Sequence, residues 1–321
     1  MRILVTGGAG FIGSHYVRTL LDGAYPDHGD TRVTVFDKLT YAGDRGKLPE
    51  PHPRLTFVQG DVCDADALLA ALPGHDAVVH FAAESHVDRS LASAREFFTT
   101  NVLGTQTLLD CCRRTGVDRI VHVSTDEVYG TIDEGSWTED HPLLPNSPYA
   151  ASKAASDLAV RAYFRSHDLP VMITRCCNNY GPYQYTEKVI PLFVTNLLSG
   201  RDVPLYGDGL NVREWIHVDD HCRAVQLVLE NGRPGEVYNI GGGTEITNRE
   251  LTKQLLELCG EGWDRVRHVT DRKAHDRRYS LDDTKIRREL GYQPAIAFEQ
   301  GLADIVKWYR DNRDWWDKTT R

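Results

Sequence analysis

The sequence predicts an α/β protein with a doubly wound parallel sheet and a smaller C-terminal substrate-binding lobe. Two patterns support this fold class. Short β-branched runs alternate with longer helical patterns through the first half of the chain, and a glycine-rich turn joins the first run to the first helix. Such alternation is typical of a parallel sheet that helices cover on both faces. The 321 residues suffice for one large domain or two closely associated ones.

Seven short apolar runs predict the strands of this sheet, because a turn or a helical pattern follows each of them. The predicted strands comprise residues 3–5, 33–36, 55–58, 77–81, 119–124, 171–174 and 237–240. The predicted helices comprise residues 11–21, about 94–114, and 149 to about 166. Residues 130–148 hold three prolines and two glycines, which predicts a loop.

The pattern changes after residue 178. Residues 180–213 are rich in glycine, proline and tyrosine, and residues 243–300 mix short helical patterns with charged loops. We interpret these stretches as a smaller lobe threaded through the end of the first. The predicted division gives residues 1–177 and 214–242 to the sheet domain, and residues 178–213 and 243–321 to the smaller lobe.

The composition excludes several classes of protein. Hydrophobic residues make up 41% and charged residues 26%, and no apolar run approaches the ~18 residues of a membrane span. The net charge of −9 argues against a nucleic-acid partner. The seven cysteines include two adjacent pairs and no CxxC, which indicates a cytoplasmic protein without a disulfide framework, and no metal site is expected. The first residues predict no targeting signal.

The glycine-rich turn predicts a dinucleotide site. It satisfies GxGxxG at Gly8, Gly10 and Gly13, and also the wider GxxGxxG that begins at Gly7. Glycines there allow a tight turn, so that backbone N–H groups approach a pyrophosphate at a helix N-terminus. The alternative is a turn without a ligand. The predicted strand before the motif and the helix after it favour the dinucleotide.

Acidic residues at two strand ends point to the kind of dinucleotide. Asp37 closes the second predicted strand, where a carboxylate hydrogen-bonds the adenosine ribose and repels a 2′-phosphate. NAD is therefore expected rather than NADP. Asp61 ends the third predicted strand and is placed to meet the adenine. A strand-end cap is the alternative role of either carboxylate.

Five residues form the candidate catalytic set. Tyr149 and Lys153 share one face of a predicted helix, and a lysine beside a phenol lowers its pKa so that the tyrosine acts as a base. Thr125, Asp126 and Glu127 follow the fifth predicted strand at its carboxyl end, where ligands bind in open α/β sheets. Adjacent carboxylates there suit paired acid and base work. The alternatives are a surface helical pair and a solvated loop.

These motifs resemble a known family. The glycine turn with Tyr149 and Lys153 is similar to the extended short-chain dehydrogenase/reductase superfamily, which has a Rossmann-type sheet. Within it, residues 124–130 (STDEVYG) resemble the nucleotide-sugar 4,6-dehydratases, whereas epimerases of the same fold lack the Asp-Glu pair. Further likeness to the members that act on dTDP-glucose is carried by residues 81–90, 175–182 and 271–276, and the resemblance extends from Met1 to about Tyr309.

The resemblance implies a reaction cycle without net redox change. Tyr149 would remove the O4 proton of dTDP-glucose while C4 gives hydride to NAD⁺. Glu127 would then take the C5 proton and Asp126 would protonate the departing C6 hydroxyl, before hydride returns to C6. Thr125 would hydrogen-bond O4, and Lys153 would also hold the nicotinamide ribose. The product would be a 4-keto-6-deoxy sugar nucleotide for deoxysugar biosynthesis.

The same resemblance implies two sets of binding residues. The cofactor set is Gly7, Gly10, Phe11, Ile12, Gly13, Asp37, Leu39, Thr40, Asp61, Val62, Ala82, Ala83, Ser85, Thr100, Tyr149, Lys153 and Asn179. The substrate set is Ser85, Thr125, Asn178, Lys188, Val189, Pro204, Tyr206, Arg213, Asn248, Arg272, His275 and Tyr279. Residues 265–278 hold eight basic side chains, of which we expect at most three to touch ligand, because a diphosphate needs only one or two arginines.

Oligomeric state and competing functions complete the expectations. Small residues beside Tyr149 and Lys153, in a helix that pairs between subunits in the superfamily, lead us to expect a homodimer. One alternative function is another nucleotide-sugar 4,6-dehydratase or an epimerase, acting on a UDP or GDP sugar. Another is a catalytically silent NAD-binding regulator, which the presence of all five catalytic candidates disfavours.

Overall fold

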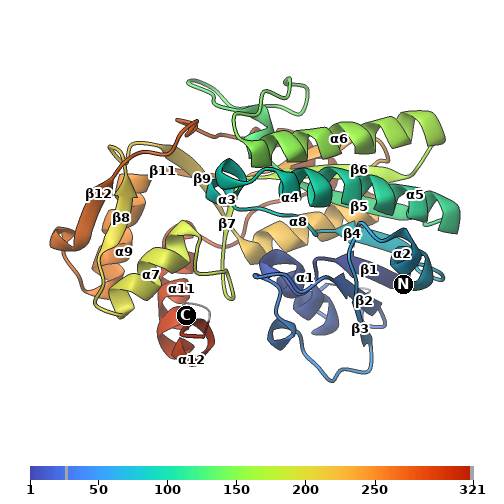
Figure 1. The fold of residues 1–321 in the computed structure, drawn as a ribbon, viewed down its shortest axis with the longest axis horizontal. Coiled ribbons are helices and arrows are strands. Elements are labelled where there is room, and N and C mark those ends of the chain that lie inside the picture. Colours follow the sequence, from blue (N-terminus) through green and yellow to red (C-terminus); the bar gives the residue numbers. More distant parts are fainter. Residues whose placement is uncertain (26–27, 319–321) are drawn as a thin grey trace.

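The computed structural model describes residues 1–25 and 28–318, and its centre is a seven-stranded parallel sheet (Figure 1). The strand order is β10-β6-β5-β4-β1-β2-β3. The chain runs outward from β1 on one side and then from β4 on the other, as in a doubly wound fold. The predicted fold class is confirmed. The strands of this sheet are β1 (Arg2–Thr6), β2 (Arg32–Asp37), β3 (Leu55–Gln59), β4 (Ala77–His80), β5 (Arg119–Thr125), β6 (Val171–Cys176) and β10 (Val237–Ile240).

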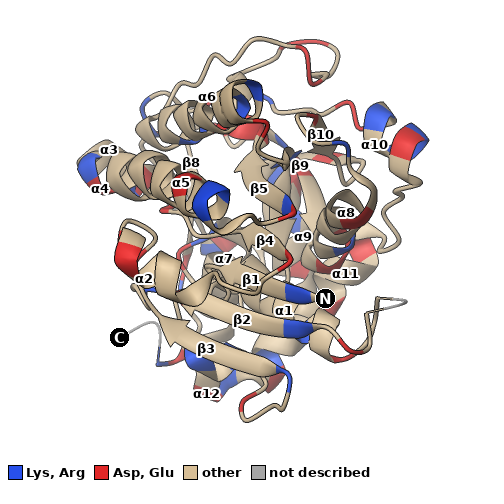
Figure 2. Cartoon of the chain, turned by 90° about the vertical axis from the view of Figure 1, so that its right-hand side faces the viewer, with Lys and Arg blue, Asp and Glu red and all other residues tan. Residues whose placement is uncertain are grey.

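Helices cover both faces of the sheet, as Figure 2 shows. The blue and red segments of that ribbon, which mark charged residues, lie mainly on the outer helices and loops, whereas the strands are mostly tan. A strand covered on both faces is a continuous apolar run, and all four residues of β4 are buried. One face carries α2 (Ala65–Ala71), α5 (Thr105–Thr115) and α6 (Pro148–His167), and the other carries α1 (Phe11–Leu21) and α8 (Val218–Asn231).

The helix predicted around residues 94–114 is interrupted. After the short helix α3 (Val87–Ala92), the chain forms α4 (Arg95–Phe97), then a π-helical segment over residues Phe98–Gly104, and then α5. Such segments are rare within helices and are found mostly at functional sites. This one brings Thr100 to the cavity described below.

Local sequence sets the ends of α6, the helix that carries Tyr149 and Lys153. The Ser147 hydroxyl accepts a hydrogen bond from the Ala150 N–H at 3.1 Å, and Pro148 occupies the first turn. At the other end, Asp168 adopts a left-handed conformation with φ 51° that stops the helix. The predicted helix is confirmed, with its start one residue earlier than expected.

The remaining elements form a smaller lobe, seen at the left of Figure 1. Its helices α7 (Val189–Leu198), α9 (Asn248–Cys259) and α11 (Phe298–Asp311) pack together beside two small sheets of order β11-β9-β7 and β12-β8. The strands are β7 (Asn178–Tyr180), β8 (Val203–Tyr206), β9 (Val212–His217), β11 (Thr244–Thr247) and β12 (Val266–Val269). The short helix α12 (Arg313–Trp316) also belongs to this lobe, whereas α10 (Thr284–Leu290) packs on β10 and α8 of the large sheet. The 3₁₀ turns η1 (Arg45–Lys47) and η3 (Asp126–Tyr129) lie in the part with the large sheet, and η4 (Trp263–Arg265) precedes β12.

Three apolar clusters form the core, one on each face of the large sheet and one in the smaller lobe. The tryptophan near the C-terminus, Trp316, lies in the core of the smaller lobe together with Ile305. Tyr279 and Tyr292, however, pack in the core of the large sheet, although the sequence predicts residues 243–321 to belong to the smaller lobe. The lobe boundaries stay a prediction. Among the described residues, no helix is both long and apolar enough to cross a bilayer.

Candidate active site

A cavity of about 310 Å³ lies at the carboxyl ends of the parallel strands. Asp37 at the end of β2, Thr125 at the end of β5 and Cys176 at the end of β6 all line it. It therefore lies where a doubly wound sheet binds its ligands. The predicted residues that line it are Gly7, Gly10, Phe11, Ile12, Gly13, Asp37, Thr40, Asp61, Val62, Ala82, Ala83, Ser85, Thr100, Thr125, Asp126, Glu127, Tyr149, Lys153, Asn178, Asn179 and Lys188.

The glycine turn is packed so tightly that side chains are excluded from it. Gly7 has φ 69°, and a Cβ there would lie 2.6 Å from the backbone nitrogen of Ala82. A Cβ at Gly13 would lie 2.3 Å from the Gly7 carbonyl oxygen. Gly10 is the N-cap of α1 and supplies no side-chain cap, so the first-turn N–H groups face the cavity uncapped. This cradle fits the pyrophosphate of a dinucleotide.

Asp37 and Asp61 are both held by fixed contacts. The Asp37 carboxylate accepts hydrogen bonds from the backbone N–H groups of Ala9 at 2.9 Å and Leu39 at 2.8 Å, and burial raises its pKa. Each carboxylate oxygen keeps a further lone pair for a ribose hydroxyl. Asp61 pairs with Lys38 at 2.7 Å, and this contact lowers the pKa of Asp61 although burial opposes the change. Leu39, with φ 58°, does not line the cavity.

Tyr149 and Lys153 are buried together at the cavity wall. The Lys153 ammonium donates a hydrogen bond to the Val123 carbonyl oxygen at 2.8 Å, and burial lowers the pKa of Lys153 to about 8. Burial also raises the pKa of Tyr149 well above its ordinary value, and the nearby Glu127 carboxylate adds to this, while the neighbouring Thr125 side chain opposes it. The expected lowering of the Tyr149 pKa is thus not seen, because loss of hydration around the phenol dominates.

The two adjacent carboxyl groups have unlike surroundings. Thr125 caps the 3₁₀ turn that carries them: its hydroxyl accepts the Glu127 N–H at 3.3 Å and donates to Asp126 Oδ1 at 3.2 Å. Burial raises the pKa of Asp126 well above its ordinary value, and the carboxylates of Glu127 and Glu214 add to this. Burial raises the pKa of Glu127 as well, but the cations of Lys188 and Arg213 counter it. Both pKa values are thus raised, and the cations near Glu127 make it the more readily ionised of the two.

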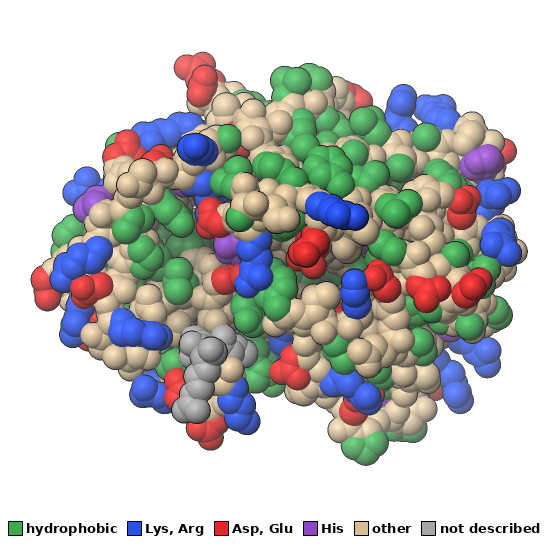
Figure 3. Space-filling model, viewed as in Figure 1, with side chains coloured by type: hydrophobic (Ala, Val, Ile, Leu, Met, Phe, Trp, Pro, Cys, Tyr) green, Lys and Arg blue, Asp and Glu red, His purple; other side chains and the backbone are tan. Residues whose placement is uncertain are grey.

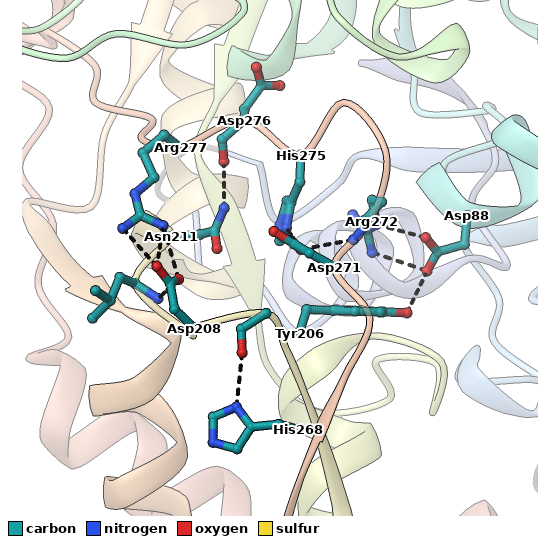
Figure 4. A network of polar contacts seen from close by, with 12 residues as sticks. Asp88, Tyr206, Asp208, Asn211, His268, Asp271, Arg272, His275, Asp276 and Arg277 are labelled. Atoms are coloured by element: carbon teal, nitrogen blue, oxygen red, sulfur yellow. Dashed lines mark hydrogen bonds and ion pairs between the residues drawn. The ribbon is translucent and has the colours of Figure 1, made fainter.

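Several predicted substrate residues lie outside the cavity, and Figure 4 shows where three of them gather. The Arg272 guanidinium pairs with Asp88, with Nε 2.7 Å from Oδ1, and its Cζ lies 5.3 Å from the centre of the Tyr206 ring. His275 contacts Asp271 at 2.7 Å next to them. The structure thus brings Tyr206, Arg272 and His275 together, although none of them lines the cavity.

The other predicted substrate residues are spread over four elements and a loop. Arg213 is buried, donates to the Asp276 carbonyl oxygen at 2.9 Å, and lies with Cζ 4.2 Å from the centre of the Tyr279 ring. Val189 and Asn248 begin α7 and α9, and Pro204 lies in β8. The basic run is largely ion-paired on its outer face, through Arg265 with Glu261, Arg267 with Asp202, Arg277 with Asp208, and Arg278 with Glu245.

The sequence did not reveal a polar cluster that joins the two parts of the molecule beside the cavity. The Tyr41 hydroxyl donates to Glu187 Oε1 at 2.9 Å, and Arg89 Nε donates to Glu187 Oε2 at 3.0 Å. The Arg89 guanidinium lies 3.8 Å from the centre of the Tyr41 ring. These residues come from three separate loops or short helices, so no spacing in the sequence connects them. Arg89 follows Asp88, the partner of Arg272, on α3.

Within residues 1–25 and 28–318, no group of three or more His, Cys, Asp or Glu side chains could hold a metal ion.

The chain is similar in sequence and in fold to known nucleotide-sugar dehydratases. Residues 4–305 match the family described as GDP-mannose 4,6 dehydratase. The dTDP-glucose 4,6-dehydratase of Streptomyces niveus is 60% identical over 319 residues, which are 99% of this chain and 95% of that protein. The structure of DesIV, a dTDP-glucose 4,6-dehydratase of Streptomyces venezuelae with NAD and TYD bound, has a TM-score of 0.98 and 65% identity, and covers 99% of this chain and 100% of its own.

A second solved structure shows the same likeness at lower sequence identity. The dTDP-glucose 4,6-dehydratase of Bacillus anthracis in complex with NAD has a TM-score of 0.92 and 46% identity, over 99% of each chain. The family match alone spans most of the sequence, and the relatives match it nearly end to end. The chain therefore belongs to the GDP-mannose 4,6 dehydratase family.

Proposed function

We propose that the chain is an NAD-dependent dTDP-glucose 4,6-dehydratase, a carbon-oxygen lyase that forms dTDP-4-keto-6-deoxyglucose and water in deoxysugar biosynthesis. One observation carries the proposal. A buried Tyr149–Lys153 pair and two carboxyl groups with unlike pKa values share one cavity with a glycine cradle. Relatives that carry this activity name cover nearly the whole chain.

The cofactor would be NAD. Relatives of this chain bind NAD, and the glycine turn fits its pyrophosphate. When bound, NAD supplies a nicotinamide ring that accepts a hydride from C4 of the sugar and returns it to C6. The first turn of α1 would hold the pyrophosphate, Asp37 the adenosine ribose, and Lys153 the nicotinamide ribose. The other predicted cofactor residues that line the cavity would complete the site.

Tyr149 would take the O4 proton of the sugar. Its phenol is protonated in a buried site, so its ionisation needs nearby positive charge, which Lys153 provides on the same helix face. Thr125 would hydrogen-bond O4 and so align it with the phenol. Removal of this proton by a positioned base is the step on which oxidation at C4 depends.

Asp126 and Glu127 would carry out the elimination. A ketone at C4 acidifies the C5 proton, so a carboxylate suffices to remove it, and Glu127 is the more acidic of the pair. Asp126 holds a proton because it is buried beside other carboxylates, which suits a general acid for the leaving C6 hydroxyl. The unlike surroundings of the two groups set their separate roles.

The substrate would extend from the cavity towards the Asp88–Arg272 pair. Ser85, Asn178 and Lys188 line the cavity and would contact the sugar. The residues outside it, among them Arg272, Tyr206 and His275, would hold the diphosphate and the nucleoside. Arginine suits this position because it contacts phosphate in a bidentate manner.

The decisive test of the proposal is incubation with dTDP-glucose. We expect an alkali-labile chromophore of a 4-keto sugar to appear without added reductant, because the hydride taken from C4 returns to C6. UDP-glucose and GDP-mannose serve as matched alternative substrates. Turnover of one of these in preference to dTDP-glucose would assign a different nucleotide sugar, and formation of a C4 epimer without loss of water would assign an epimerase.

Asp37 offers a prediction about cofactor choice. We expect Asp37→Ala to weaken NAD binding by about 1.5–3 kcal/mol, the range for a hydrogen bond to a charged group, and to weaken NADP binding less, since the repulsion of the 2′-phosphate is removed. Asp37→Asn is the control, because its amide oxygen can still accept one backbone N–H. Fluorescence titration of both cofactors measures the preference, and an unchanged ratio would refute the ribose assignment.

We propose further that the protein is a homodimer paired through α5 and α6. Figure 3 shows hydrophobic side chains gathered where these helices lie in Figure 1. Phe98 and Leu103 in the π-helical segment before α5, and Leu158 on α6, are exposed. Ala151 on α6 is small enough for close approach of a second helix.

Sedimentation at micromolar concentration should give a dimer, and Leu103→Glu with Leu158→Glu should give a monomer. A monomeric unaltered protein would refute the pairing.

The place of action is proposed to be the cytoplasm. All seven cysteines are free thiols in the structure, and none is paired across the fold. This is the pattern of proteins kept in a reducing compartment.

A further inference from the structure

A buried charged network lies directly behind Lys153, and no step described so far uses it. Asp157 follows Lys153 by one helical turn on α6, and both side chains are buried, at 1% and 4% exposure. Residues four apart share one helix face. The carboxylate of Asp157 therefore lies on the Lys153 side of the helix.

Two further strands supply partners to this carboxylate. Arg175 on β6 donates from Nε to Asp157 Oδ2 at 2.9 Å, and its NH1 group donates to the Tyr129 hydroxyl at 2.7 Å. His122 on β5 lies with Nε2 3.4 Å from Asp157 Oδ1. Burial opposes ionisation of Asp157, but Arg175, His122 and Lys153 together lower its pKa to about 2. Asp157 is thus an anion throughout the neutral range.

The histidines around the network contribute no charge near neutral pH. Burial lowers the pKa of His122 to about 4. His80 on β4, whose ring centre lies 5.3 Å from that of His122, has its pKa lowered well below the ordinary value, again by burial. The Cys176 thiol on β6 is neutral too, since burial raises its pKa to about 12.

The network therefore holds two cations and one carboxylate. Arg175 stays charged under all conditions of interest. Lys153 is the member that can lose its proton, because burial disfavours its ammonium form and Asp157 is the first among the groups that oppose this. Removal of the Asp157 charge would leave two buried cations with no anion between them.

We propose that Asp157 is a positioning residue that keeps Lys153 protonated at the wall of the active site. It acts through Lys153, from the opposite side of the buried network, and does not line the cavity itself. Lys153 in turn provides the positive field that ionisation of Tyr149 needs. The consequence for the reaction rests on the proposed function, whereas the charge relation between Asp157 and Lys153 does not.

The test is the pH dependence of Asp157→Asn. A nearby opposite charge shifts a pKa by ~1–3 units. Loss of the Asp157 charge should therefore lower the pKa of Lys153 by roughly this amount. The alkaline fall in kcat/KM for dTDP-glucose should then occur ~1–3 pH units lower than in the unaltered enzyme. An alkaline limb at the same pH in both proteins would overturn the proposal.

Asp157→Asn leaves the buried Arg175 without its carboxylate partner, which could prevent folding. A second variant therefore removes both charges. Asp157→Asn with Arg175→Gln neutralises both partners, and we expect the same direction of shift. Asp220→Asn is the matched control. Asp220 is a buried carboxylate on α8 that accepts the N–H groups of Ala295 and Ile296 at 3.0 Å, far along the chain from Lys153. Its loss should lower thermal stability without moving the pH profile.

A measurement that needs no catalytic turnover tests the relation between Asp157 and Lys153 independently of the proposed function. Titration of the Lys153 amine by NMR of ¹³C-labelled lysine, assigned with Lys153→Arg, reports its pKa directly in the NAD-loaded protein. A lower midpoint in Asp157→Asn supports the proposal even if dTDP-glucose is not the substrate. An unchanged midpoint in both Asp157 variants overturns it, even if the enzyme is active.

Discussion

Tyr149→Phe is expected to abolish the first step of the reaction. The variant keeps the ring and its packing but removes the only proton acceptor proposed for O4, so oxidation at C4 cannot begin. Loss of a general base typically lowers a rate ~10²–10⁴-fold. Mixing the NAD-loaded variant with dTDP-glucose should give no absorbance of reduced nicotinamide and no exchange of the C5 proton with solvent.

A control distinguishes lost chemistry from lost binding. Burial of Tyr149 means that a change there could disturb the cavity wall. The affinity of the variant for dTDP and NAD should therefore be measured alongside the rate, and we expect both to remain close to those of the unaltered protein. Formation of reduced nicotinamide by Tyr149→Phe at the ordinary rate would show that another group takes the O4 proton.

Glu127→Gln should stop the reaction one step later. The C4 oxidation does not need this carboxylate, so reduced nicotinamide and a 4-keto hexose should accumulate in a single turnover. Exchange of the C5 proton with deuterium from solvent should slow by ~10²–10⁴-fold, because the base for that proton is gone. Stopped-flow absorbance and mass spectrometry of the sugar measure the two effects separately.

Asp126→Asn is the matched partner of this variant. It leaves both the oxidation and the C5 base intact, and removes the acid that protonates the C6 hydroxyl. We expect C5 exchange to continue while loss of water slows most. If Glu127→Gln dehydrates the substrate at the ordinary rate, or if both variants stall at the same point, the proposed division of roles is wrong.

The large sheet was predictable because its strands carry their signal locally. Each buried strand is a short apolar run, and the glycine turn after β1 forms a motif within seven residues. The approach of Gly7 to the Ala82 backbone explains why that motif tolerates no side chain. Sequence reasoning therefore found both the strands and the cavity residues that lie at their ends.

The smaller lobe and α8 were less predictable. The sequence of α8 places charged residues among its buried ones, and its apolar positions Val218, Cys222 and Val225 lie three or four apart within a stretch that begins Val-Asp-Asp-His. In the smaller lobe, strands of three to six residues pair across long separations in the sequence. Such short runs resemble loops until their partners are known.

The sequence predicts which residue types form the site, but not the direction in which their pKa values shift. The spacing of Tyr149 and Lys153 indicates a helical pair, but not that burial would raise the tyrosine pKa. That result depends on desolvation, which no sequence pattern encodes. The Tyr41–Glu187–Arg89 cluster was missed for a related reason, since its members meet only once the fold is complete.

The short helix α3 gives the molecule a dependence on ionic strength. Its adjacent residues Asp88 and Arg89 have opposite charges and pair with two different segments of the smaller lobe, at Arg272 and Glu187. Both pairs reach partly into solvent, so dissolved ions screen them over a Debye length of ~8 Å at physiological salt. We therefore expect the attachment of α3 to the segments that carry Arg272 and Glu187 to be firmest in dilute buffer and to loosen as salt is added, while the apolar cores stay intact.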